Sequence, residues 1–287
     1  MVTPLRLLAR LALSTIGVVA AIYAAVCVYL WSQQRALIFL PERVVRHTPT
    51  EFGLPYEEVT IPIGDGDVLY GWWLPSRLTP STPVTVLYLR GNDGNLGTEL
   101  PRLRALHLHG LPILAIDYRG YGRSSGPAPS EAQVYDDATA AWDYLVRDKG
   151  IPAGQIILYG HSLGSAVAAE LALRRGNACA LVLEGAFTSM ADMARLEYPL
   201  IPAEWLLNQR FDTAGKLARL RLPILLVHGS ADTVVPASMS RQLQESSGGR
   251  PALLFIEAAG HEEALSANGR QLQQALAQLA QHCDRLR

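Results

Sequence analysis

The sequence predicts an α/β fold with a mostly parallel sheet covered by helices on both faces, preceded by one membrane-spanning helix. After residue 83, short apolar runs bounded by Gly or Pro alternate with helical stretches, as strands and helices alternate around a parallel sheet. Before Arg35, 24 consecutive residues carry no charge, which is typical of a helix that crosses a bilayer.

The composition excludes two classes of protein. With 49% hydrophobic and 18% charged residues, the chain is not intrinsically disordered. Its 25 basic and 26 acidic side chains give a net charge of −1, so no basic surface for nucleic acid is expected. The charge is unevenly divided, because residues 1–46 hold five arginines against one glutamate and the remaining 241 residues carry a net charge of −5. A basic, apolar front end therefore precedes a mildly acidic body.

The front end is expected to be a membrane anchor and linker over residues 1–46. Residues 11–31 would form about 31 Å of helix, which matches a hydrocarbon core of about 30 Å. The apolar core of a secretory signal peptide is only about 7–15 residues long, although the Ala-rich residues 20–25 would permit cleavage. Aromatic side chains gather toward the C-terminal side of the helix, where they favour the membrane interface.

The anchor predicts a single-pass membrane protein whose orientation is set by weak signals. Two arginines precede the helix and three follow it, so the positive-inside rule gives almost a tie. A short basic N-terminus usually stays in the cytoplasm, which would place the body on the periplasmic or extracytoplasmic side. Cys27, Cys179 and Cys283 show no regular spacing, so we expect no disulfide and treat them as small hydrophobic or incidental residues.

The body, residues 47–287, is expected to be one domain. Strands over 56–63 and 67–74, joined by Gly64, Asp65 and Gly66, predict a hairpin. Six further strands are predicted at 84–89, 113–116, 156–159, 180–183, 224–227 and 252–256. Helices are predicted at 130–147, 163–175, 237–244 and 262–282, the first with a capping box from Ser130 to Gln133. The hairpin and six βα units make an eight-stranded sheet.

A candidate nucleophile lies where the third of these six strands runs into a helix. Residues 160–164 read Gly-His-Ser-Leu-Gly, a nucleophile-elbow pattern in which glycines flank the serine because the turn is too tight for side chains. The pattern alone is common by chance, and the strand before it and the helix after it make it informative. We therefore expect Ser162 to be exposed at the C-terminal edge of the sheet.

A serine hydroxyl needs a base, and the base needs a carboxylate to hold its tautomer. His261 follows the last strand, in a loop at the same sheet edge as Ser162. Asp232 follows the preceding strand, so the chain order of nucleophile, acid and base is the one this fold class uses. Glu184, at the end of the strand over 180–183, is a rival for the acid.

The other histidines do not predict a metal site. His107 and His109 are two residues apart and cannot share a helix face. His161 is the variable residue of the elbow, and His228 is expected to pack at the end of its strand. No cofactor or metal is expected.

Two backbone N–H groups are expected to hold an oxyanion. One belongs to Leu163, directly after the nucleophile, and the other to Asn92 in the oxyanion loop, residues 90–95. The glycines in and after this loop do not match the dinucleotide fingerprint, and residues 117–122 lack the lysine of a phosphate-binding loop.

These residues resemble the α/β-hydrolase superfamily, and more narrowly its membrane-anchored serine hydrolases of the bud-emergence type, related to serine aminopeptidase-like domains. The resemblance runs from about Phe39 to the C-terminus. It is carried by residues 37–41, 65–75, 90–92, 117–126, 160–164, 185–189 and 228–236. It implies an α/β-hydrolase fold with a triad of Ser162, Asp232 and His261. One departure is Arg90, where the family usually has histidine, and a cation there would favour an anionic or phospholipid-like substrate.

A short lid is expected over residues 185–222. Its apolar groups at 198–202 and 205–207 would either cover an acyl chain or pack on the sheet edge. The sequence thus predicts a membrane-anchored serine hydrolase that cleaves esters or thioesters of a small or lipid-like acyl substrate, including an acylated protein. A peptidase, an acyltransferase with the same triad and a non-catalytic tethered binding module remain alternatives.

Overall fold

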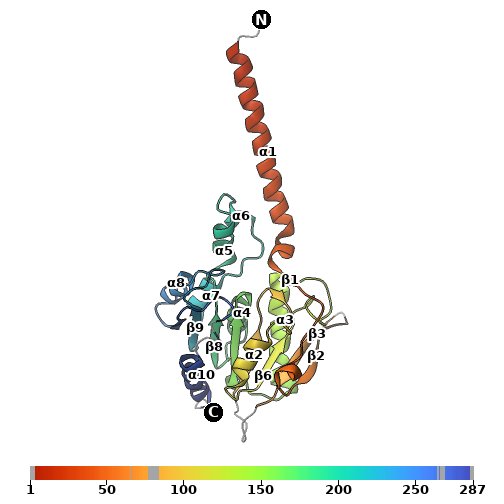
Figure 1. The fold of residues 1–287 in the computed structure, drawn as a ribbon, viewed down its shortest axis with the longest axis vertical. Coiled ribbons are helices and arrows are strands. Elements are labelled where there is room, and N and C mark those ends of the chain that lie inside the picture. Colours follow the sequence, from red (N-terminus) through yellow and green to blue (C-terminus); the bar gives the residue numbers. More distant parts are fainter. Residues whose placement is uncertain (1–3, 65, 77–83, 264, 266–268, 285–287) are drawn as a thin grey trace.

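The computed structural model of the protein describes residues 4–64, 66–76, 84–263, 265 and 269–284. One long helix, α1 (Pro4–Ile38), projects from an α/β body (Figure 1). Its segment Leu8–Ile38 is long and apolar enough to cross a membrane, and its apolar window is not buried by the rest of the protein. The helix thus extends beyond the predicted residues 11–31 at both ends and is compatible with a signal anchor.

The main sheet has eight strands in the order β10-β9-β8-β7-β4-β6-β3-β2. The strands are β2 (Glu57–Gly64), β3 (Asp67–Leu74), β4 (Thr85–Leu89), β6 (Ile113–Ile116), β7 (Ile156–His161), β8 (Ala180–Glu184), β9 (Ile224–Gly229) and β10 (Ala252–Ile256). The hairpin strands β2 and β3 pair antiparallel, β3 pairs antiparallel with β6, and the other pairs are parallel. The predicted mostly parallel, eight-stranded sheet is confirmed. Asp65, in the predicted turn, lies outside the described residues.

Alternation along the strands divides the core into two layers, one on each face of the sheet. In β4, Leu87 and Leu89 point to the face covered by α3 (Glu131–Asp143), α4 (Leu163–Arg175) and α8 (Ser238–Ser246). Val86 and Tyr88 point to the face covered by α2 (Leu100–His107) and α10 (Gly269–Asp284). Both faces are buried, as the near-continuous apolar runs predict.

Short elements complete the body. The predicted capping box is present at α3, where the Ser130 N–H donates to Gln133 Oε1 at 2.9 Å. The unpredicted strands β1 (Leu40–Pro41) and β5 (Asp93–Gly94) pair in parallel. The remaining short helices are η1 (Pro49–Phe52), η2 (Tyr144–Asp148) and η3 (Ala153–Gln155).

The expectation of unpaired cysteines is wrong for two of the three. Cys179, which precedes β8, forms a disulfide with Cys283 in α10, 104 residues later. Both side chains are buried where α10 packs on the sheet, a contact that cysteine spacing alone does not reveal. Cys27 is free.

The lid contains α5 (Met190–Glu197), α6 (Ala203–Leu206) and α7 (Thr213–Arg219). Helix α7 packs against α4 and α8 on the body, whereas α5 and α6 rise from the sheet edge on the side of the body from which α1 projects (Figure 1). Leu200 and Trp205 are 84% and 88% exposed, so they do not pack on the sheet edge.

Candidate active site

Ser162 lies in a strained turn between β7 and α4. Its backbone has a φ of 51°, a left-handed value that is unusual for a residue with a side chain. The flanking glycines make the turn possible. A Cβ atom at Gly164 would collide with the carbonyl oxygen of Leu89, and one at Gly160 would collide with that of Gly164. The backbone thus has the sharp strand-to-helix geometry of a nucleophile elbow.

Asp232 and His261 form a close pair. The Nδ1 atom of His261 lies 2.6 Å from Oδ2 of Asp232. The other carboxylate oxygen accepts hydrogen bonds from the backbone N–H groups of Val234 and Val235, each at 2.8 Å. His228 was expected from the sequence only to pack at the end of its strand. Its Nε2 atom lies 3.1 Å from Oδ2 of Asp232. The carboxylate is thereby fixed from several directions.

The contacts of Asp232 also keep it ionised. Burial alone would raise the pKa of Asp232, but the hydrogen bonds with His228, His261 and the Val235 N–H outweigh burial and hold the pKa well below its ordinary value. A negative charge therefore faces Nδ1 of His261. Such a charge stabilises the imidazolium that forms when a histidine base takes up a proton.

His261 lies against the elbow. Its ring centroid is 5.1 Å from that of His161, the residue before Ser162. A Cβ atom at Gly185, where φ is +57°, would lie 2.9 Å from Cε1 of His261, so a glycine at the end of β8 makes room for the imidazole. Within the described part of the chain, Ser162 has no hydrogen bond to His261. Such contacts are often long in unliganded sites and tighten when substrate binds.

The rival acid, Glu184, does not contact His261. Its Oε2 accepts hydrogen bonds from Arg102 Nε at 3.1 Å and from the Tyr159 hydroxyl at 2.8 Å. Arg102 also contacts Glu99 at 2.8 Å and Nε2 of His161 at 3.1 Å. Sequence reasoning missed this buried network, because nothing in the short helix α2 distinguishes Arg102 from a surface arginine.

Burial and the neighbouring Arg102 together set the protonation state of His161. Burial, together with the charge of Arg102, holds the pKa of His161 well below its ordinary value, so the ring is neutral. Since the guanidinium can only donate, His161 Nε2 accepts and its proton is assigned to Nδ1.

One cluster has metal-like spacing. Ligand atoms of His161, His261 and Glu262 lie within 4.8 Å of one another. However, Arg102 bonds both His161 Nε2 and Glu262 Oε2, the latter at 3.0 Å, and Nδ1 of His261 faces Asp232. A cation here would meet the guanidinium charge, so the residues fit a metal poorly.

The oxyanion loop lies against the nucleophile. A Cβ atom at Gly91 would lie 3.5 Å from that of Ser162. Asn92 is fixed by its side chain, which donates to the Ile38 carbonyl at 2.9 Å, and its own carbonyl accepts from the Leu40 N–H at 2.9 Å. Among the described residues, no protein acceptor takes the backbone N–H of Asn92 or Leu163. Both donors are thus available to a ligand.

The expected role of Arg90 in attracting an anionic substrate is not supported. Its side chain is fully buried, with Nε 3.6 Å from Asp117 and a terminal nitrogen 3.8 Å from Glu99. The guanidinium also bonds the carbonyl oxygens of Asp93 and Gly94. Arg90 is therefore a buried residue that holds the oxyanion loop through hydrogen bonds to two of its carbonyl oxygens.

Comparison with known proteins supports the α/β-hydrolase fold and the family resemblance found in the sequence. A family model described as serine aminopeptidase, S33, matches residues 97–216, which include Ser162 but not Asp232 or His261. The uncharacterized protein Rv2307c of Mycobacterium tuberculosis is 33% identical over 92% of this chain and 93% of its own. Protein bem46 of Schizosaccharomyces pombe is 30% identical over 72% of this chain and 73% of its own. The solved esterase Pf2001 of Pyrococcus furiosus has a TM-score of 0.69 and 21% identity, covering 84% of this chain and 98% of its own.

Proposed function

Because the chain belongs to the α/β hydrolase superfamily, we propose that it is a membrane-anchored serine hydrolase that cleaves carboxylic esters or thioesters through an acyl-enzyme. The observation that carries the proposal is the hydrogen-bonded pair of Asp232 and His261 beside the strained turn at Ser162. Pf2001, an esterase by name, shares the fold.

The proposed reaction has two steps. Ser162 Oγ attacks the acyl carbonyl while His261 Nε2 takes the hydroxyl proton, and the N–H groups of Asn92 and Leu163 stabilise the oxyanion. The tetrahedral intermediate collapses, the bond to the alkoxide or thiolate breaks, and His261 returns the proton to this leaving group. Water, deprotonated by His261, then attacks the acyl-enzyme in the same way and releases the carboxylic acid. Asp232 holds the Nδ1–H tautomer throughout.

The environment favours acyl groups over peptides. The cavity beside the site is lined mainly by apolar side chains, which suits a hydrocarbon chain better than the charged side chain of a peptide.

We further propose that the body lies outside the cytoplasm. The buried disulfide between Cys179 and Cys283 supports this side of the membrane, because disulfides persist in oxidising compartments. The short basic N-terminus before α1 is consistent with this orientation.

A fluorophosphonate probe, which reacts with activated serines, tests the nucleophile. Wild-type protein should be labelled and should hydrolyse short-chain esters, and Ser162→Ala should lose labelling and at least about 10³-fold in kcat/KM. Ser165→Ala is the matched control, because Ser165 lies in the first turn of α4 and is buried. It should keep both properties.

Two outcomes would overturn the proposal. Folded wild type that is not labelled would indicate a non-catalytic binding module. Labelled protein that cleaves peptides but no esters or thioesters would indicate a peptidase.

A further inference from the structure

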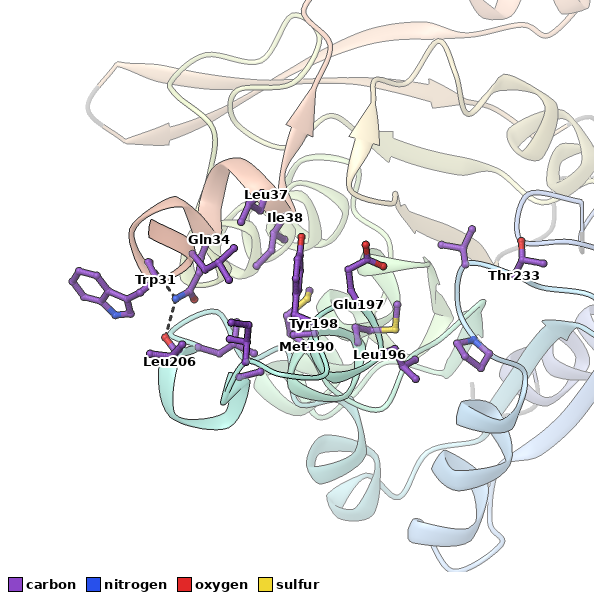
Figure 2. Close-up of a pocket in the computed structure, with 18 residues that line it drawn as sticks. Trp31, Gln34, Leu37, Ile38, Met190, Leu196, Glu197, Tyr198, Leu206 and Thr233 are labelled. Carbon is purple, nitrogen blue, oxygen red and sulfur yellow. Dashed lines mark hydrogen bonds between the residues drawn. The ribbon is translucent and has the colours of Figure 1, made fainter. Parts of the chain in front are cut away.

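An apolar pocket of about 590 Å³ separates the anchor helix from the lid (Figure 2). Trp31, Gln34 and Ile38 of α1 form part of one wall, and Ala194 and Leu206 of the lid form part of the other. The volume falls within the range of about 300–1,000 Å³ that is typical of small-molecule sites. Helix α1 therefore forms one wall of a cavity of the size that small-molecule sites have.

Two parts of the pocket wall are adjacent to residues of the proposed catalytic site. Ile38, in the wall, accepts the hydrogen bond from the Asn92 side chain at 2.9 Å. Thr233 and Val234, also in the wall, directly follow Asp232. The wall of the pocket is thus bonded to the oxyanion loop on one side and continues into the loop of Asp232 on the other.

Outside the pocket, the lid also contacts the part of α1 that is predicted to span the membrane. The Tyr23 hydroxyl donates to the Leu200 carbonyl at 2.7 Å, so the lid touches the anchor within the apolar span. Tyr23 is eight residues before Trp31, or about 12 Å along the helix from the predicted end of the span. The exposed Leu200 and Trp205 side chains are unfavourable in water and suited to the acyl and interfacial regions of a bilayer.

The polar groups of the pocket do not oppose an apolar ligand. Gln34 donates to the Leu206 carbonyl at 2.8 Å and accepts from the Asn208 N–H at 2.8 Å, so its amide is satisfied. Glu197 is the one charged lining residue in the described chain, and it is solvent-exposed.

Resting on the proposed function, we infer that this pocket binds one acyl chain of a bilayer lipid ester, which enters from the membrane between α1 and the lid and presents its carbonyl to Ser162. The substrate class is thus a membrane lipid ester with a long acyl chain. In this proposal the acyl chain supplies the affinity for the lipid, and contacts of the head group or of the buried Arg90 are not required.

Chain-length selectivity tests the pocket. Full-length protein in phosphatidylcholine vesicles is given umbelliferyl butyrate or umbelliferyl palmitate. Ala194→Trp fills the pocket and should lower the palmitate-to-butyrate ratio of kcat/KM at least about tenfold, since each excluded methylene costs about fourfold. Ala191→Trp is the matched control, because Ala191 lies in the same helix but does not line the pocket. Because the pocket still buries the same length of acyl chain, this variant should leave the ratio within about twofold of wild type.

Entry from the bilayer is tested without turnover. Ser162→Ala protein is reconstituted with a phosphatidylcholine that carries a diazirine at the end of one acyl chain. Adducts on Met193 or Leu206 are expected, and Ala194→Trp should remove them. Adducts confined to the exposed α1 residues Val18 and Val19 would overturn the inference.

The two experiments separate two kinds of failure. If wild type hydrolyses no butyrate ester, the proposed function fails. If butyrate hydrolysis depends on Ser162 but Ala194→Trp leaves the ratio unchanged, the pocket inference alone fails. A lowered ratio without pocket adducts would overturn entry from the membrane, because the chain would then arrive through water.

Discussion

At the scale of single residues, Asp232 shows how a carboxylate can be kept charged although it is buried. Hydrogen bonds lower its pKa, so its contribution to stability is present above the unfolded value of about 3.9 and is lost only as the pH falls through the lower folded value. Asp232 therefore stays ionised from about pH 4 upward. A loss of activity between about pH 4 and 7 would therefore not report protonation of Asp232.

We expect Asp232→Asn to lower kcat/KM by about 10⁴-fold, because an amide in this position favours the wrong imidazole tautomer. Asp136→Asn, at a largely exposed position on α3 that pairs with Arg174, should change kcat/KM less than about twofold. The measurement is the pH profile of ester hydrolysis. Wild type should keep a fully ionised Asp232 at every pH of the profile above about 4, and an Asp232→Asn variant with wild-type kcat/KM throughout would contradict its role in holding the tautomer.

The residues of the site differed in how well they could be predicted. Ser162, Asp232 and His261 all follow strands whose carboxyl ends meet at one sheet edge, so topology alone brings them close. Arg102 could not be predicted, because it reaches the site from the opposite layer, through contacts with Glu184. The burial of Arg90 could not be predicted either, because burial is a property of the folded chain.

At the scale of elements, the strands were predictable because both sheet faces are buried and the central strands are near-continuous apolar runs. Strands β1 and β5 were not, because each has two residues and their pairing depends on how the chain leaves α1. Helix α1 is longer than the predicted span of residues 11–31. It continues because Gln34 and Arg35 find partners in the body, the latter donating to the Pro129 carbonyl at 3.0 Å.

The elbow is the element in which backbone geometry matters most. We expect Gly164→Ala to lower the free energy of unfolding by more than about 2 kcal/mol and to abolish probe labelling, because its Cβ would meet the Leu89 carbonyl. Gly154→Ala is the control, since its Cβ would meet nothing within 4 Å. It should be neutral or slightly stabilising in urea unfolding. Equal effects of the two changes would contradict close packing at the elbow.

At the scale of the whole molecule, helix α1, the lid and the rest of the body are joined by direct contacts. The anchor touches the lid through Tyr23 and Gln34 and the oxyanion loop through Ile38. Separating the anchor from the body would therefore remove one wall of the pocket. A near-zero overall charge conceals this division between a basic, apolar helix and an acidic α/β body.

The last prediction concerns the compartment in which this unit folds. The disulfide closes a loop of 104 residues between the sheet and the final helix, and its loss should cost about 2–5 kcal/mol of stability. If the body is exported, protein trapped from cells and denatured should expose only Cys27 to a thiol reagent before reduction and all three cysteines afterwards. Three reactive thiols without reduction would contradict export. In the control variant Cys27→Ser, no thiol should react before reduction. A C-terminal alkaline phosphatase fusion, active only outside the cytoplasm, should agree with the thiol count, because the same orientation determines both results.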